Sequence, residues 1–118
     1  MIVKIKNTPF NVKVCNSRNE IEKGMMGQKF EGFDGMLFFM GTGEHSFWMK
    51  NCIVPLDIIF INSNLIITDI HHNCPPCKGP LCDHYEGYGK YVLELPGGKC
   101  KELGINEEDS VKFNFESH

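Results

Sequence analysis

The chain has 118 residues, which fits one domain over residues 1–118 and excludes two-domain enzymes. Apolar residues make up 42% of the chain, enough to build a single core at this length. The net charge is −3 and Arg18 is the only arginine, so the composition excludes a basic field of the kind that holds nucleic acid.

Short strands dominate the predicted secondary structure. Alternating apolar and polar residues, or apolar runs between turn-forming residues, predict strands at 2–6, 10–15, 36–40, 45–50, 56–61, 65–71, 91–95 and 111–115. The segment from Ser17 to Glu20 has the capping-box pattern of a helix start, and Gly27 is placed to end that helix. Residues 99–103 predict one further helical turn, closed by Gly104.

Residues 73–90 show no period and are rich in Cys, Pro, Gly and Tyr. This composition predicts a long irregular loop, and such loops are usually functional or held by a constraint. About seven or eight strands with one or two short helices predict a mainly β protein, α+β at the margin, folded as a compact β-barrel or sandwich.

The sequence also bears on membrane insertion and location. The longest apolar run, residues 36–40, is too short to span a bilayer, so we expect no membrane insertion. The start of the chain alternates apolar and polar residues and contains no unbroken apolar stretch of the signal-peptide kind. We expect a soluble protein, cytoplasmic if the chain is complete and exported if a signal segment was trimmed.

Several segments carry a resemblance to one family. They are HSFWMKN at 45–51, PLDIIFI at 55–61, YVLELPGG at 91–98, LGI at 103–105, GMM at 24–26 and GMLF at 35–38. Together they strongly resemble the domain of unknown function 192 family, over nearly the whole chain. The resemblance implies a small β-rich, barrel-like domain, and it implies no reaction.

Cys74, Cys77, Cys82 and His84 form a C-x2-C-x4-C-x-H pattern within the predicted loop. Four such ligands suit tetrahedral zinc, the cofactor that this pattern would hold. The same residues are compatible with a disulfide between Cys77 and Cys82, or with free thiols in an exposed loop. The family resemblance favours the pair, because relatives keep two residues similar to Cys77 and Cys82 more often than one similar to Cys74.

Trp48, the only tryptophan, shares a predicted strand face with Ser46 and Lys50. A flat aromatic ring beside an ammonium group and a hydroxyl suits a sugar ring or another small polar ligand. Packing in the core is the competing role for a lone tryptophan.

Two carboxylates interrupt apolar strands. Asp57 needs a partner such as Lys50, His45 or a set of backbone amides, because an unpaired buried carboxylate costs several kcal/mol. Glu94, between Leu93 and Leu95, has the same need.

These residues predict a small binding or accessory module whose polar pocket holds a small ligand. The expected ligand-binding residues are His45, Trp48, Lys50, Asp57 and Glu94. The alternative is a small hydrolase, or a thiol-redox or metal-dependent enzyme, that uses His45, Asp57 and the Cys74–His84 loop. The sequence has no Gly-rich phosphate loop, GxSxG elbow or HExxH helix, so the question of enzymatic activity stays open.

Overall fold

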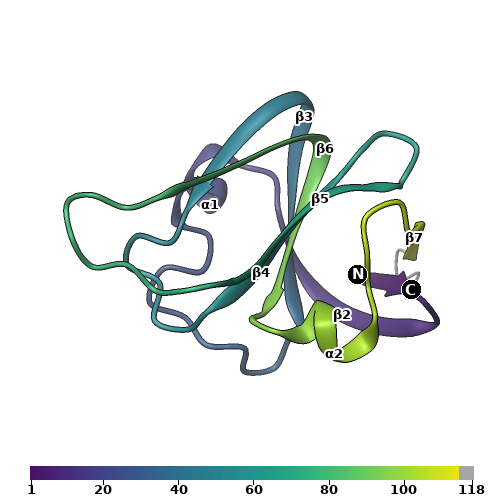
Figure 1. Cartoon of the computed structure of the whole chain (residues 1–118), viewed down its shortest axis with the longest axis horizontal. Coiled ribbons are helices and arrows are strands. Elements are labelled where there is room, and N and C mark those ends of the chain that lie inside the picture. The colour runs from purple at the N-terminus through teal and green to yellow at the C-terminus, as the bar shows by residue number, and fades with distance from the viewer. Residues whose placement is uncertain (115–118) are drawn as a thin grey trace.

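Seven strands form one curled sheet in the computed structural model, which describes residues 1–114 (Figure 1). The strands are β1 (Ile2–Ile5), β2 (Thr8–Cys15), β3 (Gly35–Trp48), β4 (Leu56–Ile61), β5 (Ile67–Cys74), β6 (His84–Pro96) and β7 (Val111–Asn114). Two short helices are α1 (Arg18–Lys23) and α2 (Lys99–Leu103). The predicted mainly β architecture is confirmed. No helix within residues 1–114 has both the length and the apolar character needed to cross a membrane.

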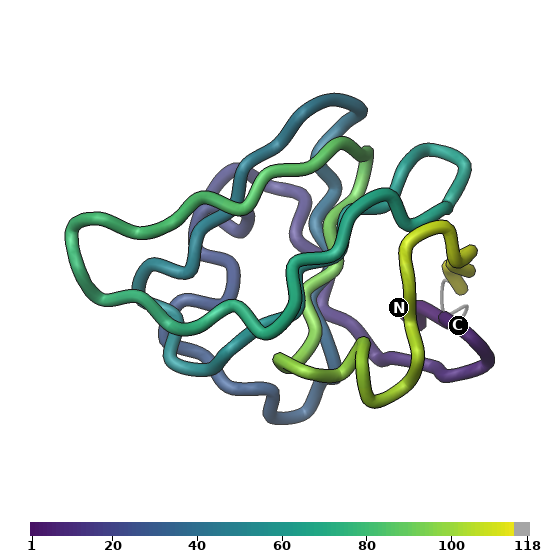
Figure 2. Tube along the Cα trace, in the orientation of Figure 1, coloured from purple at the N-terminus to yellow at the C-terminus, as the bar shows by residue number. Residues whose placement is uncertain are grey.

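The sheet has the strand order β5-β4-β6-β3-β2-β1-β7. Neighbouring strands are antiparallel except for the β2–β3 pair, which is parallel. The sheet curls until its two ends meet: the Val111 amide donates to the Leu65 carbonyl at 2.8 Å, and the Ile67 amide donates to the Asp109 carbonyl at 2.9 Å. Figure 2 shows the C-terminal segment lying beside the β4–β5 turn, which gives the sheet a barrel-like outline.

The central strands are covered on both faces, and β4 is buried at all of its positions. Alternate residues of each central strand therefore enter two different cores. One, the barrel core, contains Val3, Ile5, Leu37, Ile59, Ile61, Leu93 and Val111. The other, the methionine-rich core, contains Met25, Met36, Phe38, Met49, Ile58 and Phe60. The methionine-rich core lies on the side of the sheet that α1 covers (Figure 1).

The predicted irregular loop at 73–90 is wrong over much of its length. β6 already begins at His84, and residues 84–89 pair with β3. Glycines interrupt the alternation of apolar and polar residues that would predict this strand. A Cβ at Gly87 would lie 2.6 Å from the Phe60 ring, and one at Gly89 would lie 2.7 Å from the Ile61 carbonyl oxygen. The strand thus needs glycine where β propensity would favour larger residues.

Smaller differences concern element boundaries. The capping box of α1 is confirmed, but the helix ends at Lys23, where Gly24 adopts a φ of +46°, and not at Gly27. The predicted strands 36–40 and 45–50 are two parts of β3, separated by a bulge between Phe39 and Gly43. Of the predicted last strand, Phe115 lies outside the described residues.

Candidate functional site

A cavity of about 200 Å³ lies between α1, the segment that follows it, and strands β3 and β6. The apolar part of its wall includes Met25, Met26, Phe38, Met40, Phe47 and Trp48. Three exposed polar residues, Glu22, Lys23 and Ser46, line its mouth. Glu94 of β6 is buried and lines the inner part of the cavity.

Local backbone chemistry holds this wall in place. Ser17 and Glu20 cap the start of α1 reciprocally, and the turn at Gly24 brings the chain back over the Phe38 ring. A β-bridge joins Met26 to Cys52, and the Gly27 amide donates to the Asn51 carbonyl at 2.9 Å. The segment after α1 is therefore fixed to the segment after β3, so the cavity is preformed.

Glu94 is the most unusual residue of the cavity. It is only 3% exposed, and its Oε1 atom has no hydrogen-bond partner among residues 1–114. Its neighbours across the sheet, Met36 and Ile58, are apolar. Desolvation raises the pKa of Glu94 to about 8, so at neutral pH the side chain is mainly an uncharged carboxylic acid.

Three buried thiols belong to the methionine-rich core on the same side of the sheet as this carboxyl group. Burial raises the pKa of Cys15, Cys52 and Cys74 to about 11 each, and the charge of Glu94 contributes to each rise. Cys52 also lines the cavity. At neutral pH these cysteines are protonated thiols, and a thiol is a poor nucleophile compared with a thiolate.

At the mouth of the cavity, Trp48 is the centre of a polar and aromatic cluster. The Lys50 ammonium lies 5.2 Å from the centroid of the Trp48 ring, and the His84 ring stacks on Trp48 at 5.8 Å. Ser46 Oγ lies 3.1 Å from His84 Nδ1. The structure therefore brings Trp48 and Lys50 together, as the strand period predicts, and Trp48 is 40% exposed.

Asp57 lies on the other face of the sheet. Its Oδ1 accepts hydrogen bonds from the amides of Asn73 at 2.7 Å and Gly98 at 3.0 Å. Its Oδ2 accepts a hydrogen bond from the Cys100 amide at 2.8 Å. Of the partners considered from the sequence, the backbone amides are the ones present, and they tie β4 to the end of β5 and the start of α2.

The five expected ligand-binding residues do not converge on one site. Trp48 and Glu94 line the cavity, and Lys50 lies over the Trp48 ring without lining the cavity itself. His45 instead binds its own strand, with Nε2 2.6 Å from the Gly41 carbonyl oxygen. Asp57 is separated from Glu94 by the sheet, because it faces the barrel core.

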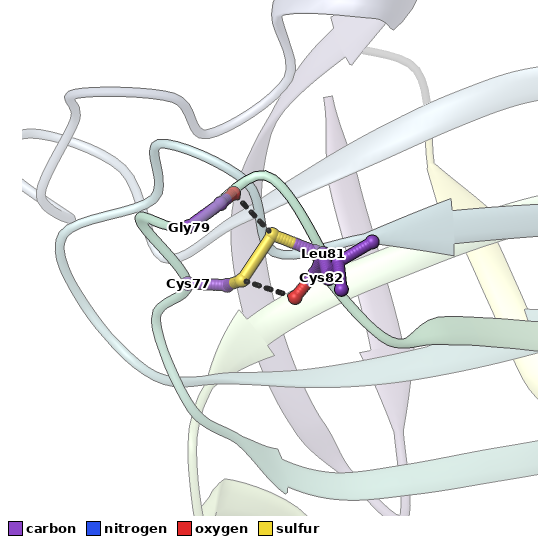
Figure 3. Close-up of a disulfide and its surroundings, with 4 residues drawn as sticks. All are labelled: Cys77, Gly79, Leu81 and Cys82. Atoms are coloured by element: carbon purple, nitrogen blue, oxygen red, sulfur yellow. Dashed lines mark hydrogen bonds between the residues drawn. A yellow bond between two sulfur atoms is a disulfide. The ribbon is translucent and has the colours of Figure 1, made fainter.

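The cysteine loop contains a disulfide between Cys77 and Cys82 (Figure 3). Cys74 is a buried free thiol, and His84 is engaged by Ser46 and Trp48. The four residues of the expected zinc pattern are therefore not gathered around one point. Within residues 1–114 there is no group of three or more His, Cys, Asp or Glu side chains placed to hold a metal ion.

Backbone hydrogen bonds join the disulfide loop to the segment after β3, which carries part of the cavity wall. The Cys77 amide donates to the Met49 carbonyl at 3.2 Å, and the Asn51 amide donates to the Cys77 carbonyl at 2.9 Å. Asn51 and Cys52 are in turn bonded to the segment after α1. A continuous backbone network thus connects the disulfide to the cavity wall.

Sequence reasoning did not find the apolar wall of this cavity. Met25 and Met26 fall within the predicted helix, for which Gly27 is the expected end, whereas α1 ends at Lys23. Met40 falls at the end of a predicted buried strand. The one available signal was Glu94 itself, a carboxyl group between two leucines with no partner nearby in the sequence.

Comparisons with known proteins agree on the fold. The model of the family DUF192, described as uncharacterised ACR, matches residues 1–113. A crystal structure of a protein of unknown function from Novosphingobium aromaticivorans DSM 12444 is similar with a TM-score of 0.84 and 30% identity. The match covers 95% of this chain and 84% of that one.

A second similar crystal structure comes from Sinorhizobium meliloti 1021 and is described as a candidate transcription regulator. Its TM-score is 0.81 at 29% identity, with 94% of this chain and 89% of that chain covered. No curated protein matches the sequence.

Proposed function

The chain belongs to the uncharacterised DUF192 family, and from its cavity we propose that it is a binding or accessory module for a small ligand. The ligand has an apolar body and a polar group that hydrogen-bonds to Glu94. The observation that carries this proposal is the unpartnered Oε1 atom of a buried carboxyl group that lines a cavity. Buried polar atoms almost always have a partner, so this one points to a missing molecule.

The size and lining of the cavity support a small molecule. A dry engineered cavity of roughly 150 Å³ binds benzene, so about 200 Å³ accommodates a ligand of similar or slightly larger size. An apolar wall with few polar groups is the usual composition of small-molecule sites. Lys50 and His84 flank Trp48 at the entrance, where they would contact only a ligand that extends outward.

The enzyme alternative has no comparable support. Asp57 lies beside the start of the Cys74–His84 loop, but its carboxylate is occupied by three backbone amides, and His45 binds its own strand. The S. meliloti neighbour's description raises nucleic acid as a partner. A net charge of −3 with one arginine does not favour that partner here.

The disulfide supports an oxidising location for the protein. Disulfides persist mainly outside the reducing cytosol. This one closes a loop that is exposed except at its two cysteines. Alkylation of free thiols in intact cells, followed by mass analysis, would report whether Cys77 and Cys82 are paired there. Modification of both residues would refute this location.

Tryptophan fluorescence and thermal denaturation test the binding proposal. Trp48 is the only tryptophan and is 40% exposed, so acrylamide should quench it and a bound ligand should reduce that quenching. The screen would contain small sugars, nucleosides, carboxylic acids, alcohols and amines. We expect at least one compound to shift the emission and to raise the melting temperature.

A pair of variants locates the binding. Ser46→Phe places a ring at the mouth of the cavity and should weaken binding, whereas Thr42→Phe, an equally exposed position of β3 outside the cavity, should not. If no compound raises the melting temperature of the unmodified protein, or if both variants bind equally well, the cavity is not a binding site.

A further inference from the structure

We infer that the ligand of this cavity is a small organic cation, a protonated amine on a short apolar body, which forms an ion pair with Glu94. This inference rests on the proposed function and narrows it to one chemical class. It follows from three properties of the cavity: the acceptor at its inner end, the lack of a resident positive charge there, and the aromatic and thioether groups of its wall.

The inner end of the cavity holds a carboxyl oxygen atom that can accept a hydrogen bond and has no donor in the part of the chain that the structure describes. Oε1 of Glu94 is buried without a donor among residues 1–114, and an ammonium N–H would supply one. An anionic ligand could bind only the protonated acid, by accepting its hydrogen bond, and would suppress the ionisation of Glu94. An amine both satisfies the oxygen atom and stabilises the ionised form of Glu94.

The described side chains packed near Glu94 supply no positive charge. The thiols of Cys15, Cys52 and Cys74, on β2, on the segment after β3 and on β5, belong to the methionine-rich core and are uncharged at neutral pH. Its register partners Met36 and Ile58 are apolar.

Charged groups from α1 are confined to the mouth. Glu22 and Lys23 are both exposed there, so solvent screens their charges. Lys50 lies against Trp48. Among residues 1–114, therefore, none supplies a cation at the inner end of the cavity.

The wall of the cavity is suited to a cation with apolar substituents. Phe38 and Phe47 pack edge to face at 5.1 Å, and both line the cavity with Trp48. Aromatic rings attract cations through their quadrupole, and the effect grows when water is excluded. Methionine thioethers of the same wall are polarisable and adapt to ligands of irregular shape.

Binding then carries a defined proton balance. The amine enters with its own proton and keeps it, while the Glu94 carboxylic acid loses its proton to the solvent. Burial raises the pKa of Glu94 to about 8, so about one proton is released per amine bound at neutral pH. A neutral ligand that hydrogen-bonds to the protonated acid would release none.

Three probes of nearly equal size separate the possibilities: benzylamine, benzyl alcohol and benzoate. Isothermal titration calorimetry at pH 7 in two buffers of different ionisation enthalpy measures both affinity and protons released. We expect benzylamine to bind most tightly and to release about one proton. Its affinity should rise at least about tenfold between about pH 6 and about pH 8, because the free carboxyl group loses its proton over that range.

The Glu94→Gln variant gives an independent test. Glutamine keeps the shape and hydrogen-bonding capacity but has no proton to lose, so the variant should bind benzylamine at least about tenfold more weakly and independently of pH. Glu86→Gln, on the exposed part of the same strand, is the matched control and should behave like the unmodified protein. Should Glu94→Gln fail to fold, the proton release and pH dependence of the unmodified protein decide the question.

The remaining outcomes distinguish failure of the cation inference from failure of the proposed function. If benzyl alcohol or benzoate binds more tightly than benzylamine, or if benzylamine binds without proton release, the cation inference is wrong and the small-ligand function stands. If neither these probes nor any compound of the screen binds, the proposed function fails together with the inference.

Discussion

Glu94 should make the stability of this protein fall as the pH rises. Burial raises the pKa of Glu94 to about 8 in the folded state, whereas in the unfolded chain it returns to about 4.3. Between these two values the folded protein holds a proton that the unfolded chain has lost. The contribution of Glu94 to the free energy of unfolding is thus fully favourable below about pH 4 and declines by about 1.4 kcal/mol per pH unit up to about pH 8.

Glutamine at this position removes the titration and keeps the shape of the side chain. The stability of Glu94→Gln relative to the unmodified protein should therefore increase by about 4 kcal/mol between about pH 5 and about pH 8. Urea denaturation followed by far-ultraviolet circular dichroism at four pH values measures this difference. Other titrating groups are common to both proteins, so they cancel in it.

Glu86→Gln serves as the control, because Glu86 is exposed on the same strand. Its difference from the unmodified protein should stay constant over the same pH range. A constant difference for Glu94→Gln as well would mean that Glu94 is ionised in the folded protein. The reasoning that links its burial to the cavity would then be refuted.

Three further predictions concern the rest of the fold. Asp57→Asn should lower the free energy of unfolding by about 2 to 3 kcal/mol, because the NH₂ group that replaces one carboxylate oxygen cannot accept a hydrogen bond from the backbone amides that Asp57 binds. Asp69→Asn on β5 should cost far less, and equal denaturant midpoints for the two variants would contradict this. Gly89→Ala should destabilise the protein by about 2 kcal/mol or more, because its Cβ would lie 2.7 Å from the Ile61 carbonyl oxygen. Gly79→Ala, whose Cβ would make only an ordinary contact with the Leu81 amide nitrogen at 3.9 Å, should be nearly neutral in the same denaturation experiment. Protein denatured without reductant should expose four reactive thiols and protein denatured with reductant six, and six in both samples would show that the Cys77–Cys82 bond is absent.

The sequence was sufficient for the elements with strong local signals. The capping box at Ser17 and the apolar run of β4 both depend on neighbouring residues, and the structure contains both. The start of β6 could not be predicted, because Gly87 and Gly89 are dictated by Phe60 and Ile61 of another strand. Local pattern carries no information about such a contact.

The candidate site shows the same division. The need of Asp57 and Glu94 for partners was predictable from their apolar neighbours. That Asp57 finds hydrogen-bond partners among the described residues and Glu94 Oε1 does not was not predictable, because this depends on which core each residue faces. Asp57 faces the amides that start α2, whereas Glu94 faces a space that α1 and the Met25–Met26 segment only partly fill.

The pairing of β7 with β1 has a consequence for folding during synthesis. β1 pairs with β2 along one edge and with β7 along the other, and β7 leaves the ribosome after the six strands that precede it. Until β7 has been synthesised, one edge of the β1–β2 hairpin is unpaired, and Val3 and Ile5 are not covered by β7. Exposed strand edges recruit other chains, so nascent or truncated copies that end before residue 111 should aggregate by pairing through β1.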